Sequence, residues 1–335
     1  MKIQTALIGF GLSGRYLQSP FYRAHPGFEV KRVVTSRAEQ LAADFPGMEP
    51  SSDAEAVFAD PAIELVSIAT PNDTHYAFVK AALEAGKHVI VDKPACPTAA
   101  QLRELRDLAA RKDLTLYVFQ NRRWDSDFLT VRQLLSGDLL GELINYEGRF
   151  DRWKTEPNPK EWKETPSPGA GMIYDLGAHI IDQAVALFGR PLDVSGKSWS
   201  QRSFSTIPDA FDLQLEYAAP LRVSLSCSLL VREPTPRYTL HGRRGSFVKY
   251  GIDVQEDQLR AGMQPGDPDF GLEPEEQRGI LNTEIDGLDF RGPVETLRGD
   301  WWGLFDNLYR TIREGAAQAV PLEEVITQLE IIESV

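Results

Sequence analysis

The chain has 335 residues, which is more than one hydrophobic core normally supports, so its length predicts two domains. Its formal net charge of −13 argues against a nucleic-acid partner, because such a surface needs clustered lysine and arginine. No apolar run approaches the ~18 residues of a membrane-spanning helix. The cysteines, Cys96 and Cys227, provide neither a disulfide framework nor metal-ligand spacing. We therefore expect a cytoplasmic protein with no metal site, nucleic-acid partner or membrane partner.

Strand and helix patterns alternate over residues 1–120 with the spacing of βαβ units. The apolar run Ile3–Gly9 is typical of a buried parallel strand. Further strands are predicted over residues 28–35, 64–69, 88–91 and 115–119. Helices are predicted over residues 14–23, 38–44, 74–85 and 99–111. Helical crossovers between strands predict a doubly wound parallel sheet.

From about residue 121 the pattern becomes one of sequential strands, so we predict a second domain over residues 121–335. Strands are predicted over residues 141–152, 194–203, 211–217, 222–230, 238–242 and 245–250, and helices over 172–188, 301–314 and 322–332. Residues 253–293 are rich in glycine, proline and acids and permit no assignment. An α+β domain follows, with a large, mostly antiparallel open sheet. Its C-terminal helices can pack back on the first domain.

A G-x-G-x-x-G motif follows the first strand and opens a helix, which is the context in which this motif binds a dinucleotide. Gly9 permits a tight turn, Gly11 lets the backbone approach a pyrophosphate, and Gly14 lets helix and strand pack closely. The helix N-terminus then offers N–H groups to the phosphates. A purely structural glycine turn is the alternative. The predicted cofactor contacts here are Gly9, Phe10, Gly11, Leu12, Ser13 and Gly14.

The end of the second strand favours NADP over NAD. An NAD site places an acidic residue there to bind the ribose hydroxyls, whereas this chain has Thr35, Ser36 and Arg37. Arg37 can pair with a 2′-phosphate, and the two hydroxyls can donate hydrogen bonds to it. Glu29 lies at the start of this strand, away from the expected site. Alternatively, Arg37 is a solvated loop residue.

Lys93 follows the strand that ends at Val91, at the sheet edge where open α/β folds bind ligands. A lysine there can stabilise the charge that develops on a substrate oxygen during hydride transfer. An ordinary surface lysine is the alternative. Other predicted cofactor contacts near this edge are Thr70, Pro71, Asn72, His75, Lys93 and Pro94.

Asp175 and His179 are four residues apart in a predicted helix, hence neighbours on one face, with Asp182 a turn further on. His179 can act near neutral pH as a general base, and Asp175 can orient His179 or substrate hydroxyls. Gly177 interrupts this helix at a cost of about 1 kcal/mol, which suggests a close approach of substrate or nicotinamide. An ordinary surface contact between Asp175 and His179 remains the alternative.

Further candidates carry weaker signals. Arg123 and Trp124, at the end of the first domain, can hold polyol oxygens, although an interdomain salt bridge explains the arginine equally well. Tyr238 can contact substrate from the second sheet, but a core or rim position is the simpler explanation. Cys96 lies near Lys93 without a base partner that would mark it as a nucleophile.

Together these residues resemble the glucose–fructose oxidoreductase/inositol dehydrogenase/MocA (Gfo/Idh/MocA) family. The resemblance covers nearly the whole chain and rests on GFGLSG (9–14), ATPNDTH (69–75), AGKHVIVDKP (85–94) and GAGMIYDLGAHIID (169–182). It implies a Rossmann domain, a second α+β domain, and catalytic roles for Lys93, Asp175 and His179. Two departures from the family pattern are Asp92, where glutamate is usual, and Ala170, where a third glycine is common.

Within the family the chain resembles the NADP-dependent scyllo-inositol dehydrogenases, through VTSR (34–37), NRRWDSDFLT (121–130), DLGAHIIDQ (175–183) and residues 237–262. The resemblance implies an NADP-dependent oxidoreductase that acts on a cyclitol or sugar, with Arg123, Trp124, Asp175, His179 and Tyr238 as substrate contacts. It also implies a homodimer or homotetramer. A catalytically silent NAD(P)-binding sensor is the alternative, and glycosidic-bond cleavage with recycled NAD is a third possibility.

Overall fold

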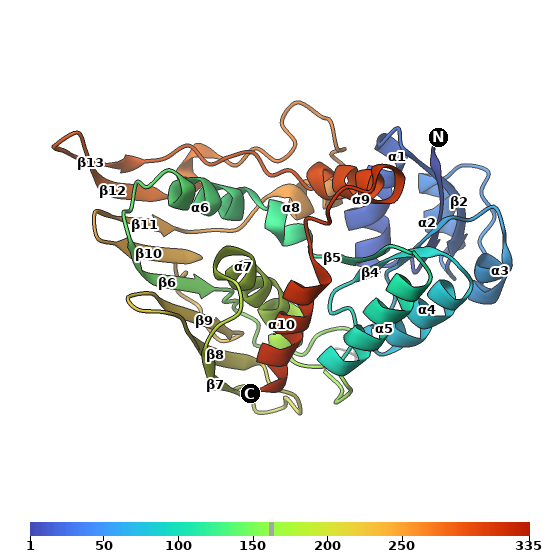
Figure 1. Ribbon diagram of the computed structural model, residues 1–335, viewed down its shortest axis with the longest axis horizontal. Coiled ribbons are helices and arrows are strands. Elements are labelled where there is room, and N and C mark those ends of the chain that lie inside the picture. Colours follow the sequence, from blue (N-terminus) through green and yellow to red (C-terminus); the bar gives the residue numbers. More distant parts are fainter. Residues whose placement is uncertain (161–163) are drawn as a thin grey trace. The chain divides into compact units, whose positions relative to one another are not determined.

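The computed structural model describes residues 1–160 and 164–335 (Figure 1). The chain forms two compact units. The first comprises Met1–Asn121, Gln255–Phe270 and Trp301–Ile326, and the second comprises Arg122–Val254, Gly271–Asp300 and Thr327–Val335. Each unit is therefore assembled from segments that are far apart in the sequence. Within the described ranges, no helix is both long and apolar enough to cross a lipid bilayer.

The first unit is built on a parallel sheet with strand order β2-β1-β3-β4-β5. Its strands are β1 (Ile3–Ile8), β2 (Phe28–Val34), β3 (Leu65–Ile68), β4 (His88–Asp92) and β5 (Leu116–Phe119). β3 and β5 are buried along their whole length, as expected of strands covered on both faces. The predicted doubly wound Rossmann sheet is confirmed. Because all neighbours run in parallel, the carboxyl ends of the strands lie at one edge.

The first unit contains the helices that connect these strands and two helices from later segments of the chain. They are η1 (Leu12–Gln18, π-helical), α1 (Ser19–Ala24), α2 (Ala38–Asp44), α3 (Ala54–Ala59), α4 (Asn72–Glu84), α5 (Ala99–Arg111), α8 (Gln255–Arg260) and α9 (Trp302–Glu314). α5 begins where Thr98 accepts a hydrogen bond from the Gln101 amide, at 3.2 Å. Local capping of this kind explains why the predicted bounds of α5 agree with the structure.

Aromatic packing attaches α9 to the core of the first unit. The Phe305 ring stacks on Phe21 of α1, with centroids 4.8 Å apart, and it meets Tyr22 edge-on at 5.0 Å. Phe119 of β5 closes the cluster at 5.9 Å from Phe305. Each such pair contributes about 0.5–1.5 kcal/mol beyond the burial of its area. The segment that starts at Trp301 is therefore an integral part of this unit.

The second unit is built on a sheet with strand order β13-β12-β11-β10-β6-β9-β8-β7. Its strands are β6 (Leu143–Arg149), β7 (Asp193–Trp199), β8 (Ala210–Glu216), β9 (Arg222–Ser228), β10 (Tyr238–Gly242), β11 (Gly245–Lys249), β12 (Ile280–Ile285) and β13 (Leu288–Pro293). β6 and β9 pair in parallel; the other described pairs are antiparallel. The predicted mostly antiparallel sheet is confirmed.

One face of this sheet carries the core of the second unit. Along β9, Val223, Leu225 and Cys227 are buried, whereas the alternate residues are more exposed. Helical elements of this unit are α6 (Ser126–Ser136), η4 (Ile173–Gly177, π-helical), α7 (Ala178–Phe188) and the turn η5 (Glu275–Gln277). η2 (Asn121–Trp124) and α10 (Leu322–Glu333) cross the division between the units. The elements that were not predicted from the sequence are α3, α6, α8, β12 and β13.

A buried ion pair ties residues 271–300 to the sheet. Lys249, at the end of β11, contacts the Glu273 carboxylate at 2.7 Å, and both side chains are almost fully buried. Lys249 Nζ also donates to the carbonyls of Tyr250 and Gln277. Burial raises the pKa of Glu273 despite this partner. The pair is therefore sensitive to the loss of either charge.

We predict that Lys249→Met lowers the free energy of unfolding by about 3–5 kcal/mol near pH 8, because it leaves the Glu273 carboxylate buried and unpaired. A carboxyl group with a raised folded-state pKa stabilises the protein at low pH, and that contribution is lost as pH rises. The loss should therefore shrink toward pH 5. Urea unfolding at both pH values checks this, with the exposed Lys31→Met as the control. An equal loss at both pH values would contradict the account.

Candidate active site

The first unit brings most of its predicted site residues to one edge of the parallel sheet. The Gly9–Gly14 turn follows β1, Thr35–Arg37 follow β2, Thr70 follows β3, and Lys93 follows β4. These strands are neighbours, so the segments lie side by side. This edge is where open α/β sheets bind their ligands.

The glycines of the turn meet three different steric demands. Gly9 has a φ of +98°, and a Cβ there would lie 2.5 Å from the Ala69 carbonyl oxygen. A Cβ on Gly14 would lie 2.1 Å from the Gly9 carbonyl oxygen. Gly11 differs, because its φ is −83° and a Cβ there would have no protein atom within 4 Å. Gly9 and Gly14 are thus required by the fold, whereas Gly11 keeps an open space.

This open space fits a dinucleotide. Gly11 caps the helix that begins at Leu12, so the space lies beside a helix N-terminus, where phosphate groups bind. Ser13 and Leu12 are accessible on the same turn, while Phe10 is buried and packs against Phe45 at 6.1 Å. Phe10 can therefore offer only its backbone to a cofactor, and its role as a cofactor contact stays a prediction.

The end of β2 presents hydroxyl and guanidinium groups. Arg37 is exposed, and its amide donates to Thr35 Oγ1 at 3.0 Å, which fixes the bend between strand and helix. Glu29 lies at the opposite end of β2, where it contacts Lys31 at 2.6 Å and Gln4 at 3.3 Å. No carboxylate occupies positions 35–37, so this loop suits a ribose 2′-phosphate better than a ribose diol.

His75 has a different place from the one predicted. Its side chain is completely buried, and its ring nitrogens lie 2.8 Å from the Pro94 carbonyl and 2.9 Å from the Thr70 carbonyl. The ring therefore links the turn after β3 to the turn after β4. We correct its assignment: His75 positions Thr70 and Pro94 from beneath and offers no surface to a cofactor.

Lys93 lies at the edge in a half-buried position, and its amide donates to Asp92 Oδ1 at 2.8 Å. The Asp92 carboxylate thus orders the turn after β4 by accepting a hydrogen bond from the amide of the next residue. Thr70 Oγ1 and Thr74 Oγ1 are 2.6 Å apart and order the turn after β3. Lys93 belongs to the first unit, and its predicted partners Asp175 and His179 belong to the second.

Asp175 and His179 lie where η4 passes into α7. Asp175 is half-buried in the π-helical turn, and His179 is a buried residue of the first turn of α7. π-Helical turns inside helices are frequent at functional sites. The His179 ring lies 6.3 Å from the Phe150 ring, measured between centroids.

Gly177 also has a different role from the predicted one. A Cβ at this position would lie 3.1 Å from the Phe211 ring of β8 and 3.2 Å from Ile173. The glycine therefore suits a place where η4 packs closely on the sheet. This packing explains Gly177 without an approach of substrate or nicotinamide.

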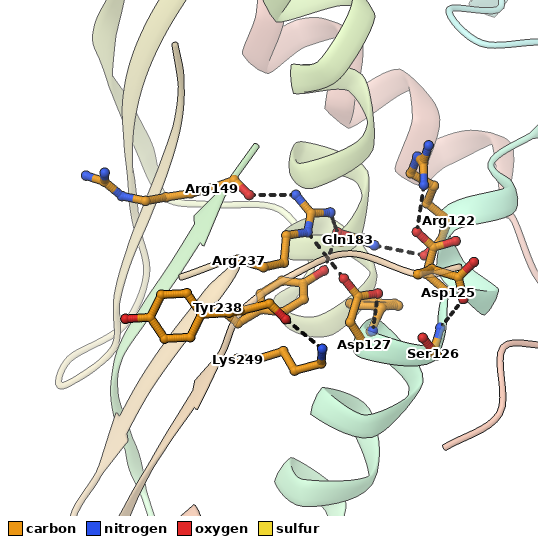
Figure 2. A network of polar contacts seen from close by, with 12 residues as sticks. Arg122, Asp125, Ser126, Asp127, Arg149, Gln183, Arg237, Tyr238 and Lys249 are labelled. Atoms are coloured by element: carbon orange, nitrogen blue, oxygen red, sulfur yellow. Dashed lines mark hydrogen bonds and ion pairs between the residues drawn. The ribbon is translucent and has the colours of Figure 1, made fainter. Parts of the chain in front are cut away.

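Arg123 and Tyr238 are interior residues of the second unit. Arg123 makes two hydrogen bonds of 2.7 Å to the Asp182 carboxylate, and both side chains are nearly inaccessible. Tyr238 is fully buried and its hydroxyl lies 2.8 Å from Gln183 Oε1 (Figure 2). Both predictions of substrate contact are corrected, because these polar groups are already engaged inside the unit. Trp124 is half-buried, so its role stays a prediction.

A buried polar network surrounds this region and was missed from the sequence. Arg237 donates to the Arg149 carbonyl at 2.8 Å and to Gln183 at 3.2 Å, and it faces Asp127 at 3.4 Å (Figure 2). Gln183 in turn donates to the Arg122 carbonyl at 2.8 Å. Coulombic attraction from Tyr238 and Asp127 offsets burial and raises the pKa of Arg237. The network holds α7, and with it His179, against the sheet.

Comparison with known proteins finds matches to both halves of the chain. A family model described as "Oxidoreductase family, NAD-binding Rossmann fold" matches residues 3–120, and the "GFO/IDH/MocA C-terminal domain" matches residues 128–248. Scyllo-inositol 2-dehydrogenase (NADP(+)) of Bacillus subtilis is 38% identical over 99% of this chain and 92% of its own. Levoglucosan dehydrogenase of Pseudarthrobacter phenanthrenivorans is 31% identical over 56% of this chain and 52% of its own.

The solved structure of the oxidoreductase YvaA from Bacillus subtilis is similar over 99% of this chain and 94% of that one. Its TM-score is 0.95 and its sequence identity 37%. The likeness therefore covers both units.

We predict that Gly11→Ala leaves thermal stability almost unchanged and weakens NADPH binding at least about tenfold, which is ~1.4 kcal/mol. The reason is that the new methyl meets no protein atom but fills the space assigned to the pyrophosphate. Thermal unfolding and NADPH fluorescence titration measure the two effects. In the matched variant Gly14→Ala the methyl meets the Gly9 carbonyl, so its stability should fall. If Gly11→Ala binds NADPH as tightly as the wild type, the open space at Gly11 does not hold the pyrophosphate.

Proposed function

Since the chain belongs to the Gfo/Idh/MocA oxidoreductase family, we propose that it is an NADP-dependent dehydrogenase of a cyclitol or sugar, with scyllo-inositol and scyllo-inosose as the first candidate pair. The observation that carries the proposal is the glycine turn at the same sheet edge as Lys93, in a chain that retains Asp175 and His179. The named relatives act on alcohol groups of small polyhydroxy compounds, which supports this substrate class.

The proposed reaction divides its chemistry among three side chains. Bound NADP supplies or accepts the hydride. The Lys93 ammonium donates a hydrogen bond to the substrate oxygen and stabilises negative charge on it. His179 takes the hydroxyl proton in oxidation and returns it in reduction. The Asp175 carboxylate orients His179 or a neighbouring hydroxyl. These roles are assigned by the family resemblance and by the chemistry of each group.

NADP specificity rests on the loop after β2. Arg37 is exposed there and can form charge-assisted hydrogen bonds with a 2′-phosphate, with Thr35 and Ser36 beside it. A homo-oligomeric state and a cytoplasmic location belong to the same proposal. The thiols of Cys96 and Cys227 are buried and form no disulfide, which is compatible with a reducing compartment.

The deciding experiment is a substrate panel of inososes, inositols and aldoses, each tested with NADP(H) and NAD(H) and followed at the nicotinamide absorbance band. Turnover of a cyclitol or sugar with NADP(H) would support the proposal. Tight NADPH binding without turnover of any substrate would instead indicate a sensor.

We predict that Lys93→Ala lowers kcat by at least about 10²-fold, the typical effect of removing one group that stabilises developing oxygen charge. NADPH affinity should change little, because the backbone and the β2 loop provide most of the proposed cofactor contacts. Steady-state kinetics and fluorescence titration check the two parts. Lys112→Ala, which removes an exposed lysine at the end of α5, is the control. Unchanged turnover would remove Lys93 from the mechanism.

We predict that Arg37→Ala narrows the preference for NADPH over NADH by about tenfold or more, since a charge-assisted pair contributes roughly 1.5–3 kcal/mol. The ratio of kcat/KM values for the two cofactors is the measurement. Arg32→Ala is the control, because Arg32 lies on β2, just before this loop, and pairs with Asp60 at 2.9 Å. A ratio that Arg37→Ala leaves unaltered would refute the cofactor argument.

A further inference from the structure

Arg152 lies just beyond the end of β6 and continues the row of side chains on the buried face of that strand. Side chains alternate between the faces of a strand, so Tyr146, Gly148, Phe150 and Arg152 share one face. Tyr146 and Phe150 are buried on this face. The chain stays paired beyond the end of β6, because the Arg152 amide donates to the Ser228 carbonyl at 2.9 Å. Arg152 therefore leaves the sheet on the same side as α7.

The Phe150 ring connects Arg152 with the proposed general base. The Arg152 guanidinium lies over this ring at 4.6 Å from its centroid, and the His179 ring lies 6.3 Å from it. Arg237 and Arg122 also face the ring, at 4.3 and 5.4 Å. Three guanidinium groups thus lie around the Phe150 ring, which also lies near the His179 ring.

These arginines differ in their accessibility. Arg122 is buried and contacts Asp125 at 3.0 Å. Arg237 is buried and donates to Arg149 and Gln183. Arg152 is half-exposed. Within this group it is therefore the guanidinium that a molecule arriving from solvent can reach.

The local charges favour a neutral ligand. Arg122 contacts Asp125, Arg237 faces Asp127, and Arg149 faces Asp151 at 3.6 Å. Arg152 and Asp175 add one charge of each sign to this set. Burial raises the pKa of the nearby Cys227 thiol, and the charges of Asp175 and Arg152 add smaller effects of opposite sign. With donors and acceptors balanced, an anionic substrate would gain no net attraction, while a hydroxyl group can satisfy both kinds of partner.

We infer that Arg152 is a substrate-binding residue that donates a hydrogen bond to the hydroxyl group on a carbon next to the reacting carbon of a neutral polyhydroxy compound. The inference rests on the proposed function and deepens it. Arg152 has only donors, so the hydroxyl oxygen accepts from it and the hydroxyl proton remains for a carboxylate such as Asp175. Specificity for a vicinal diol follows, because a substrate that lacks this hydroxyl leaves the guanidinium without its ligand.

The test combines a variant with a modified substrate. Wild type, Arg152→Met and Arg149→Met are assayed with an inosose that the wild type reduces, and with analogues lacking the hydroxyl on either neighbouring carbon. Arg149 is the matched control, because it is the last residue of β6, three positions before Arg152, and faces the other side of the sheet. We expect Arg152→Met to lower kcat/KM about tenfold or more on the full substrate and much less on one analogue. NADPH affinity should be unchanged.

Each outcome decides the matter. Equal losses on the full substrate and on both analogues would show a structural effect and overturn the assignment, as would an unaffected Arg152→Met. If Arg152→Met does not fold, the wild type alone decides, since full activity on both analogues would overturn the inference. A wild type that reduces no cyclitol or sugar would defeat the proposed function itself, together with this assignment.

Discussion

The tight reversal of the chain between β1 and η1 is the constraint on which the cofactor half of the proposal depends. A methyl group would collide with the Ala69 carbonyl at position 9 and with the Gly9 carbonyl at position 14. Because the backbone can approach itself this closely, the first helix begins directly at the strand edge. Its N-terminus then lies beside the ends of β2, β3 and β4, where Arg37, Thr70 and Lys93 follow. Gly11 keeps open a space that no protein atom occupies, and the proposal assigns this space to the cofactor pyrophosphate.

The elements predicted best are those whose limits are set locally. α2, α5 and β10 have the predicted bounds, and for α5 the cap at Thr98 explains why. β12 and β13 form a hairpin with a positive φ at Asp286 and Gly287, and β13 is largely exposed. An exposed strand lacks the apolar alternation that identifies half-buried strands, so it could not be recognised. The π-helical turns η1 and η4 were missed because side-chain periodicity resembles that of an α-helix over one turn.

The corrected site residues share a physical reason. A buried polar side chain must find a partner, and that partner can come from the protein as readily as from a ligand. Arg123 is satisfied by Asp182, Tyr238 by Gln183, and His75 by two backbone carbonyls. These partners lie between 5 and 59 positions away in the chain, and no single spacing rule links them. The residue types thus indicated that these side chains form hydrogen bonds, but they did not indicate whether the partner is the protein or a ligand.

This contrast explains why cofactor class can be inferred further than substrate identity. The proposed cofactor contacts are mainly backbone groups and loop ends, so their signature is a pattern of glycines that survives wide sequence change. The proposed substrate contacts in the second unit are side chains standing on a sheet, such as Arg152, or on the helix above it, such as His179. Replacing one such side chain alters the hydroxyl pattern that the site accepts while the sheet stays intact. A family can therefore conserve hydride transfer and diversify its polyols. Under the proposal, the residue that distinguishes one polyol from another is one that reaches solvent near the proposed general base, and this is the role that we infer for Arg152.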